Sequence, residues 1–473
     1  MVDGKVLAAR FAGAADFETR KVISGGNELE IFFLDGLTSG RDIADFIVRP
    51  LHEARQDERE ETLFTRAERG LVWCASMKKA SSTDEAAELL VNGFCVILFP
   101  KSGKALGCEV KTGEKRSPSA PEAENTVKGA KDAFTETIRT NTSLIRRHLR
   151  TPELRLEESV VGRRSLTKVT VCWVEGLTDP ELPARMKKRL GEIDIDGLLS
   201  PAAVEEYVTG SRKTAFPLLE FTERTDHFCQ GLLDGQVGLL VDGLPIGYLA
   251  PVSFGRLMRS PEDRATDYLS ASMLRSLRYL ALGVSLLLPG IYAAMAMFHQ
   301  QMLPTKLLLS IIESKQDVPF STLFEVVGLL CAFELLQQAG LHLPQAIGTA
   351  VSIIGGLVVG TAAVDAKLVS PAALIVTASS GICGFTLPNR ELSDALRLWR
   401  LGLTVLGGVF GLFGVTAGLL LLLVRLAGLE SLGRSYLAPF GEAEVKGALV
   451  RERLTEQKWR DGTLRPLDER NQR

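Results

Sequence analysis

The sequence predicts an α/β soluble N-terminal region of two duplicated small α/β subdomains, followed by an all-α multi-span transmembrane domain. One observation behind this prediction is an uneven charge distribution. The chain has 55 Lys and Arg and 57 Asp and Glu residues, but only 15 of these lie within the 152 residues from 277 to 428. The other observation is an internal repeat in the N-terminal half. We therefore expect a first subdomain at residues 1–115, a linker and helical connector at 116–155, a second subdomain at 156–265, a transmembrane domain at 270–430 and a basic tail at 431–473.

The repeat is visible as two pairs of similar segments. Residues 31–38 read IFFLDGLT and residues 171–178 read VCWVEGLT, an offset of 140. Residues 84–110 and 226–252 then align without gaps at an offset of 142, each with a helical pattern, a glycine and a buried apolar strand. Self-similarity of this kind indicates two copies of one structural unit. Each copy reads as strand–helix–helix–strand.

A connector separates the two copies. Residues 111–123, KTGEKRSPSAPEA, are polar and contain proline, which predicts a loop. Residues 134–148 follow with a helical pattern that ends in Arg146 and Arg147. Duplicated modules before a membrane domain indicate a scaffold for assembly or coupling.

The soluble half contains no pattern that indicates catalysis or a bound cofactor or metal. Phosphate-binding, zinc-protease and nucleophile-elbow motifs are missing, and the seven cysteines and five histidines lack ligand spacing. Asp35, Glu175 and Asp242 each precede a glycine at a strand end, where a turn is the expected role. A net charge of −2 argues against a nucleic-acid partner. We therefore predict a protein that is not an enzyme and holds no cofactor.

Five segments of the C-terminal half are apolar over the length of a bilayer. A helix needs about 20 such residues to cross the hydrocarbon core. The second segment is interrupted only by Glu325 and Glu334, and the others are uncharged. The segments are residues 279–298, 320–339, 345–364, 368–388 and 401–424.

The charges that flank these segments give conflicting signals about topology. No signal peptide opens the chain, so we expect a cytoplasmic N-terminal region. The tail carries eight Lys and Arg after residue 445, and the loop 389–400 carries three arginines. The positive-inside rule prefers both in the cytoplasm, but five crossings would place only the loop there. We favour four crossings and a cytoplasmic tail, with one segment re-entrant or in the interface.

Glu325 and Glu334 are the chemically notable groups of this half. A carboxylate inside a membrane is costly unless it faces water, a partner or the interior of a helix bundle. Nine residues are about 900° of helix, so the two side chains project from opposite faces. One interpretation places a carboxylate on an ion path, together with the face of Ser352, Gly355 and Val359, where Val359 gates by dewetting. The other interpretation is a protonated or hydrogen-bonded glutamate that packs helices together.

Small residues recur at every fourth position in two segments. This spacing lets helix backbones approach closely. It is consistent with packing inside one chain and with an oligomer contact. The residues predicted to pack helices are Gly348, Gly356 and Gly360 in one segment and Gly407 and Gly411 in the other.

Several motifs are spread over both halves of the chain, namely LDGL (34–37), NTVKGAKDAFTETIRTNTSLIRRHLRTPEL (125–154), VGRRSLTKV (161–169), RLGEIDIDGLL (189–199), TERTD (222–226), LLVDGLPIGYLAPVSF (239–254) and SLGRSYLAPF (431–440). Together these segments resemble the A subunits of GerA-type spore germinant receptors, with stage V sporulation AF-type proteins as a related branch. The similarity extends from about Asp16 to about Pro466. Two departures are Thr225, where the family has proline, and the Gln337–Gln338 pair, where it has charges.

The resemblance implies a membrane subunit of the inner membrane of the spore. It implies a homo-oligomer in the lipid bilayer that forms a nutrient-gated channel for monovalent cations. It also implies two partners, a permease-like B subunit and a lipoprotein C subunit. A non-conducting scaffold of the same complex is the main alternative. A secondary transporter would show inverted repeats among its spans, whereas duplication is visible only in the soluble half.

Overall fold

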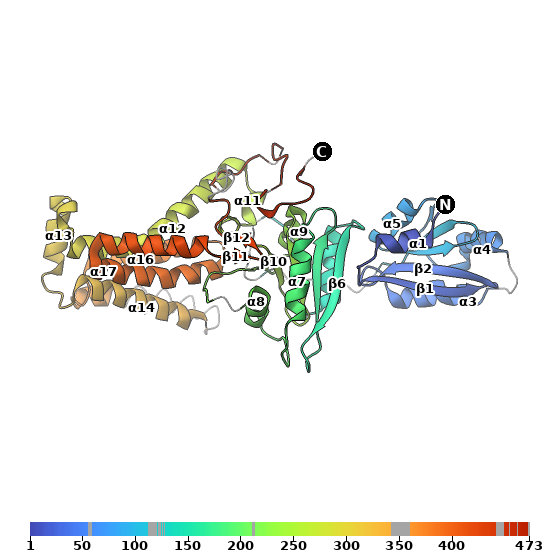
Figure 1. Ribbon diagram of the computed structural model, residues 1–473, viewed down its shortest axis with the longest axis horizontal. Coiled ribbons are helices and arrows are strands. Elements are labelled where there is room, and N and C mark those ends of the chain that lie inside the picture. Colours follow the sequence, from blue (N-terminus) through green and yellow to red (C-terminus); the bar gives the residue numbers. More distant parts are fainter. Residues whose placement is uncertain are drawn as a thin grey trace.

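The computed structural model describes residues 1–54, 59–111, 121, 124, 126, 128–210, 213–341, 360–440, 449–453, 455–460 and 462–471. Three parts follow one another along the long axis of the molecule (Figure 1). A first α/β unit lies at one end, a second α/β unit lies in the middle, and a bundle of helices forms the other end. The predicted order of soluble region and helical region is confirmed, and the predicted domain boundaries stay predictions.

The first unit is a five-stranded antiparallel sheet with helices on both faces. Helices α1 (Gly4–Arg10) and α5 (Thr83–Val91) cover one face. The segments α2 (Gly40–Asp42), η1 (Ile43–Val48), α3 (Arg49–His52), α4 (Glu60–Arg66) and η2 (Ala67–Leu71) cover the other. All six residues of the third strand in the order are buried, as expected for a strand covered on both sides. The order is β1 (Phe17–Ser24), β2 (Asn27–Leu34), β4 (Phe94–Phe99), β5 (Lys104–Glu109) and β3 (Met77–Ala80).

The second unit repeats this architecture. Helices α7 (Glu181–Gly191) and α8 (Pro201–Thr209) pack on one face of its sheet, and α6 (Ile138–His148) and α9 (Thr225–Asp234) pack on the other. The matching strand order shows that the sequence repeat is also a structural repeat. The predicted strand–helix–helix–strand unit contains only two strands, whereas each observed antiparallel sheet contains five. The order is β6 (Leu154–Val161), β7 (Thr167–Val174), β9 (Val237–Val241), β10 (Gly247–Ala250) and β8 (Glu220–Thr222).

A buried ion pair joins the two units. Arg146 in the connector helix α6 donates from Nε and Nη2 to the carboxylate of Asp16 at 2.8 and 2.9 Å. Both side chains are almost completely buried. Next to this pair, the Ala15 amide donates to the carbonyl of Leu156, at 2.8 Å, from one unit to the other.

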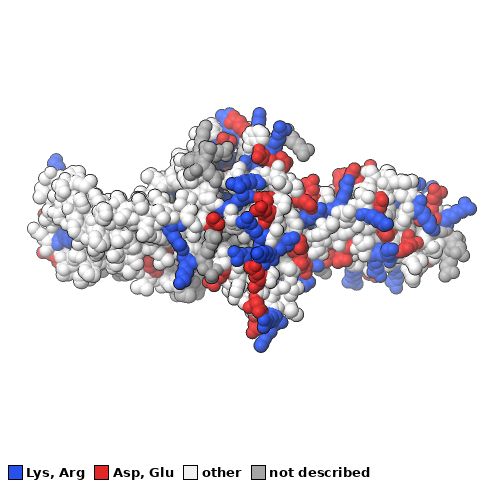
Figure 2. Space-filling view, viewed as in Figure 1, with Lys and Arg blue, Asp and Glu red and all other residues white. Residues whose placement is uncertain are grey.

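Three described helices are long and apolar enough to cross a membrane, namely α12 (Tyr268–Met297), α14 (Thr322–Leu341) and α17 (Arg390–Ala427). The predicted segment 368–388 forms a shorter helix, α16 (Pro371–Gly384), which Pro371 begins. Most of the predicted segment 345–364 lies outside the described residues. The surface of this end is nearly free of charge along the bundle (Figure 2), as expected for a surface that faces lipid.

Helix α17 is two antiparallel arms, not one straight span. Gly411 within it has φ 65° and ψ −153°, which is not a helical conformation. A Cβ atom on Gly418 would lie 2.5 Å from Cδ2 of Leu403. In a straight helix, these two residues would be roughly 22 Å apart. The expectation of a single crossing at residues 401–424 is therefore wrong, because the chain reverses direction at a glycine that an apolar pattern cannot distinguish from a packing residue.

This reversal brings the end of the bundle sequence back to the soluble region. Arg425, near the end of the second arm, donates to the carbonyl of Lys213. The tail continues over the second unit, where the Leu467 amide donates to the Leu177 carbonyl at 2.8 Å. Figure 1 shows the C-terminus beside this unit. The N-terminal region and the tail thus lie at the same end of the bundle, while the predicted four crossings and the cytoplasmic side of the tail stay predictions.

Candidate functional site in the membrane helices

Glu325 lies in the first turn of α14 and is 2 % exposed. Its Oε2 accepts hydrogen bonds from the amide and the hydroxyl of Ser370, at 3.0 and 2.8 Å. Ser370 is the N-cap residue of α16. Lys315, the last residue of helix α13 (Thr305–Lys315), places Nζ 3.2 Å from Glu325 Oε1. Glu325 thus joins α13, α14 and α16 at the end of the bundle far from the soluble region.

Glu334 contacts a different helix, in agreement with its predicted position on the opposite face. Its Oε1 accepts from Arg400 Nη2 at 2.6 Å, and its Oε2 lies 3.4 Å from Arg397 Nη1. Arg400 is buried and also donates to the hydroxyl of Ser380 on α16 at 3.4 Å. Ser380 in turn donates to the carbonyl of Ser285 on α12 at 2.7 Å. A polar chain therefore crosses the bundle from α14 through α17 and α16 to α12.

Sequence reasoning identified both glutamates but missed their basic partners. In the sequence, the arginines of residues 389–400 indicate topology, but two arginines just before an apolar span can also turn inward, as Arg397 and Arg400 do. Tertiary contacts supply the positive charge that Gln337 and Gln338 do not provide along the chain. Arg397 and Arg400 thus place two guanidinium groups beside the half-exposed carboxylate of Glu334.

The other predicted residues divide into two groups. Gly348, Ser352, Gly355, Gly356 and Val359 lie outside the described residues, so their roles stay predictions. Gly360, Gly407 and Gly411 lie within the described residues.

Gly360, Gly407 and Gly411 all lie at close contacts between helices. A Cβ on Gly360 would meet the side chain of Leu374 at 3.5 Å, an ordinary contact. A Cβ on Gly407 would lie 2.5 Å from the carbonyl oxygen of Gly290, so only glycine permits this approach of α12 and α17. Gly411 also lies against α12, but its positive φ makes it the reversal point of α17, a role that the four-residue spacing did not predict.

A second buried ion cluster lies where the soluble region meets the bundle. Asp263 is 1 % exposed and accepts from Arg275 Nε and Arg278 Nη1, both at 2.9 Å and both on α12. Arg451 of the tail donates to the carbonyl of Thr266, three residues further along, at 2.7 Å. Burial alone raises the pKa of Asp263, but the two arginines outweigh it and the pKa is lowered. The ion pairs of Asp263 and the hydrogen bond of Arg451 therefore join the tail, the second unit and the first membrane helix to one another.

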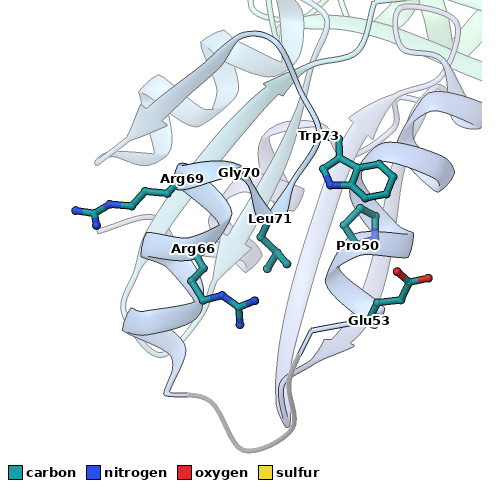
Figure 3. A pocket seen from close by; sticks show the side chains of 7 residues that line it. All are labelled: Pro50, Glu53, Arg66, Arg69, Gly70, Leu71 and Trp73. Carbon is teal, nitrogen blue, oxygen red and sulfur yellow. The ribbon is translucent and has the colours of Figure 1, made fainter.

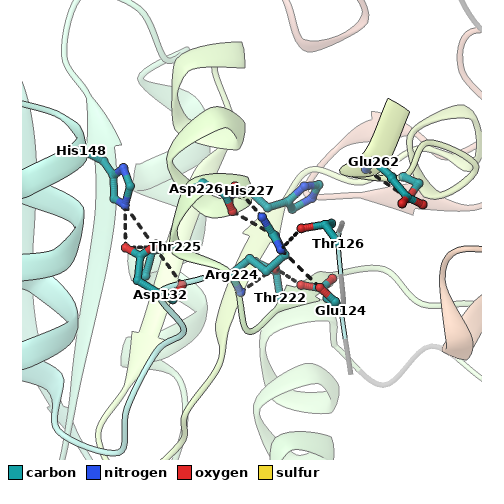
Figure 4. Close-up of polar contacts among 11 residues, drawn as sticks. Glu124, Thr126, Asp132, His148, Thr222, Arg224, Thr225, Asp226, His227 and Glu262 are labelled. Carbon is teal, nitrogen blue, oxygen red and sulfur yellow. Dashed lines mark hydrogen bonds and ion pairs between the residues drawn. The ribbon is translucent and has the colours of Figure 1, made fainter. Parts of the chain in front are cut away.

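The TERTD segment (222–226) forms a polar network at the edge of the second sheet (Figure 4). Arg224 is buried and donates from Nε and Nη2 to Asp226 at 3.0 and 2.6 Å. Thr225 donates to Asp132 Oδ2 at 2.7 Å, and His148 Nε2 lies 2.7 Å from the same oxygen. At the position where the resemblance implies proline, the hydroxyl of Thr225 thus donates a hydrogen bond to Asp132. This network joins α9 to the connector.

His227 continues the network toward the membrane side. Its Nε2 lies 2.9 Å from Glu220 Oε1, and Arg256 Nε lies 3.5 Å from the other oxygen of Glu220. Burial lowers the pKa of His227, but the hydrogen bond and the charge of Glu220 outweigh burial, so the pKa is raised above its ordinary value. A charged imidazole is thereby favoured in the folded protein.

Replacing His227 with glutamine is expected to remove a pH-dependent part of the stability. A raised folded pKa stabilises the protein fully below the unfolded value of about 6.5, and this stabilisation is lost as pH rises through the folded value. The unfolding midpoint of the variant should therefore lie furthest below wild type at pH 6 and approach it at higher pH. The measurement is thermal unfolding of the purified chain from pH 6 to 9. His52→Gln, at an exposed site, is the control, and a constant difference at every pH would contradict the assignment.

An open cleft of about 410 Å³ lies on the first unit, between α3 and the α4–η2 segment. Figure 3 shows Arg66 and Leu71 directed into it and Arg69 directed away, with Pro50 and Trp73 on the opposite wall. In the second unit, a cavity of about 310 Å³ is lined by the equivalent helices α7 and α8 and also by residues of the hairpin that follows α17. There Arg185 donates to the carbonyl of Leu432 at 3.2 Å. The post-membrane hairpin thus reaches the helical face of the second unit.

Comparison with known proteins gives a consistent result. The chain is 35 % identical to the uncharacterized membrane protein YfkQ of Bacillus subtilis, over 89 % of this chain and 82 % of that protein. It is 34 % identical to spore germination protein KA of B. subtilis, over 89 % and 78 %. It is 33 % identical to spore germination protein XA of Bacillus anthracis, over 84 % and 82 %.

Among solved structures, the N-terminal domain of the A subunit of the Bacillus megaterium spore germinant receptor GerK3 matches with 25 % sequence identity and a TM-score of 0.41. The match covers 53 % of this chain and 93 % of that one. The model of the Bacillus/Clostridium GerA spore germination protein family matches residues 5–463. This is a non-enzymatic family, as the absence of catalytic motifs predicted. The chain therefore belongs to the GerA family of spore germination proteins, as a membrane-embedded A subunit.

Proposed function

We propose that copies of this A subunit form a nutrient-gated cation channel that triggers spore germination. Its partners are a permease-like B subunit, which binds the germinant, and a lipoprotein C subunit. The complex lies in the inner membrane of the spore, with the N-terminal region and the tail on the core side. The observation that carries the proposal is the polar contact of Glu334 with Arg400, and of Arg400 with Ser380, inside an apolar bundle, because ionisable side chains within membrane helices mark ion pathways.

The two glutamates differ in how a passing ion can reach them. The side chain of Glu334 is 37 % exposed, whereas Glu325 is enclosed by Ser370 and Lys315. We therefore assign Glu334 to the pore and Glu325 to the anchoring of α14 on α16. Germinant binding on the partner shifts the population of copies toward an arrangement in which Glu334 faces the pore, and monovalent cations then flow down their gradient.

The alternative function is a non-conducting scaffold that assembles the receptor and transmits its signal. One observation favours it, since both carboxylates have basic partners within a single chain. Removing one member of such a buried pair is destabilising in itself. A loss of ion flux after a single substitution would therefore not distinguish the two functions.

A paired substitution separates them. Potassium efflux is measured from vegetative cells that express this chain with its B and C partners, together with the amount of the chain in the membrane. Glu334→Gln is expected to reduce the amount of protein, because Arg400 is left buried without its counter-charge. The double variant Glu334→Gln, Arg400→Gln should restore the amount, because neither charge remains. If Glu334 serves conduction, efflux stays low in the double variant.

Two further variants complete the experiment. Val359→Ala is expected to increase potassium leakage, because a smaller side chain weakens an apolar gate. Glu313→Gln, at an exposed site on α13, is the matched control and should leave efflux unchanged. Full efflux in the double variant at normal protein amount, with no leakage from Val359→Ala, would reject the channel and favour the scaffold.

A further inference from the structure

Two segments of the second unit form a single projection, which we call the lobe. It consists of the turn between β6 and β7, residues 162–166, and the connection between α7 and α8, residues 192–199. The amides of Arg163 and Arg164 donate to the carbonyls of Ile195 and Asp196 at 2.8 and 2.9 Å. The lobe is thus built from backbone hydrogen bonds between segments some 30 residues apart in the sequence.

Its shape is set by close packing at two glycines. Gly162 has φ 94°, and a Cβ there would lie 2.5 Å from the hydroxyl of Ser165. A Cβ on Gly197 would lie 3.2 Å from Cβ of Ser165. The hydroxyl of Thr167 also donates to the carbonyl of Leu198 at 3.4 Å. A projection fixed in this way loses little conformational entropy when a partner binds to it.

The first unit has no equivalent of this turn. There β1 ends at Ser24 and β2 begins at Asn27, so two residues connect them. In the second unit, β6 ends at Val161 and β7 begins at Thr167, so five residues connect the equivalent strands. The sheet therefore does not require the longer turn, and this turn of the lobe is an addition to the repeated architecture.

The lobe presents apolar side chains to the outside. Leu166 is 66 % exposed and Leu199 is 75 % exposed. Leu166 also has φ 46°, a conformation that costs a side-chain-bearing residue free energy and that concentrates at functional positions. The charges nearby are balanced, because Arg163 pairs with Asp194 and Arg164 pairs with Asp196. An apolar tip with balanced charge fits a protein surface better than an anionic lipid surface or a nucleic acid.

The direction of the lobe indicates which partner it meets. In Figure 1, α16 and α17 run along the long axis, which sets the membrane normal, and the two lobe segments (teal and green) project sideways at the lower edge of the second unit. A sideways projection close to the membrane reaches molecules held in the same membrane at the same height. Copies of one chain in a membrane meet this condition by symmetry, and ring contacts join different surfaces of neighbouring copies.

We propose that the lobe docks on the second α/β unit of a neighbouring copy of this chain, with Leu166 and Leu199 as its contact residues. This inference rests on the homo-oligomer of the proposed function and adds the surface that holds it together. Substitution of either leucine leaves the fold of one chain intact, since both side chains are largely exposed.

The test is photo-crosslinking between two differently tagged copies of the full-length chain in cell membranes. The benzophenone amino acid p-benzoylphenylalanine is placed at position 166 or 199. Position 23 is the matched control, because Ile23 is 69 % exposed and precedes the equivalent turn of the first unit. We expect irradiation to give a covalent dimer of both tags from positions 166 and 199, at least fivefold more than from position 23. The double variant Leu166→Asp, Leu199→Asp should lose most of the co-purification of the two tags.

Each contrary result has a distinct meaning. Equal yields from all three positions, or co-purification that survives the double variant, would overturn the lobe as the contact while leaving the oligomer in place. Products that contain only a different membrane protein would assign the lobe to a heteromeric contact and overturn the proposal. Failure of the two tags to co-purify in wild type would reject the oligomer and, with it, the channel itself.

Discussion

Replacing Asp16 with alanine is expected to destabilise the soluble region by about 3–5 kcal/mol, the range found when one partner of a buried ion pair is removed. The guanidinium of Arg146 is 1 % exposed and has two hydrogen bonds to this carboxylate. Arg146 also donates from Nη1 to the carbonyl of Thr151 at 3.2 Å, but a carbonyl does not neutralise the charge. The variant therefore leaves a cation without a counter-ion between the two α/β units. The measurement is urea unfolding of the purified chain.

The control for this prediction lies on the same helix. Arg139 and Asp35 also form an ion pair between the connector and the first unit, at 3.4 Å, but both side chains are more than a third exposed. Solvent screens such a pair, so Asp35→Ala should cost at most about 1 kcal/mol. Similar losses for the two variants would mean that burial does not decide the strength of the contact between the units.

Replacing Gly411 with valine is expected to prevent the reversal of α17. The combination of φ 65° and ψ −153° is open to glycine and essentially closed to other residues. A Cβ would also lie 2.7 Å from Cε1 of His299. The strained backbone and the overpacking each cost about 1–3 kcal/mol. The variant should accumulate poorly, and its tail should become accessible on the side of the membrane opposite the N-terminal region.

The measurement is protease protection of tags at both ends of the chain in intact cells. Gly402→Ala is the control on the same helix, since a Cβ there meets nothing within 4 Å. This change should leave the amount of protein unchanged or raise it slightly, because alanine favours helix by about 1 kcal/mol over glycine. If Gly411→Val kept both tags on one side at normal abundance, α17 would not depend on this residue for its turn.

The arrangement of buried charges suggests how a signal crosses from the soluble region to the bundle. Asp263 binds two arginines at the start of α12, and the tail binds the backbone just beside it. Further along, Glu334 connects α14 to α17, and Glu325 connects α14 to α16. Under the proposed function, a rotation of the second unit would act on α12 through the ion pairs of Asp263, and on α16 through the hydrogen bond from Ser380 to the Ser285 carbonyl. Such pairs have defined geometry and favour discrete arrangements over gradual deformation.

Local patterns were sufficient for the broad architecture. The repeated segments predicted two copies of one unit, and the two observed sheets have the same strand order. The apolar segments predicted membrane helices, and three described helices meet the length and composition for crossing. The patterns did not reveal which strands pair with one another through backbone hydrogen bonds. The strand–helix–helix–strand reading lacked the strands β1 and β3, whose partners on β2 and β5 are set by hydrogen bonds between backbones.

The sequence by itself determined the duplication, the presence of a region with several membrane helices and the two glutamates within it, because composition and periodicity are local properties that burial and bilayer thickness impose directly. Only the tertiary structure decided the partners of Glu325 and Glu334, the reversal at Gly411 and the joining of two distant turns into the lobe. These features depend on which surfaces meet in three dimensions. A serine or an arginine far away in the sequence carries no local mark of the carboxylate to which it donates a hydrogen bond.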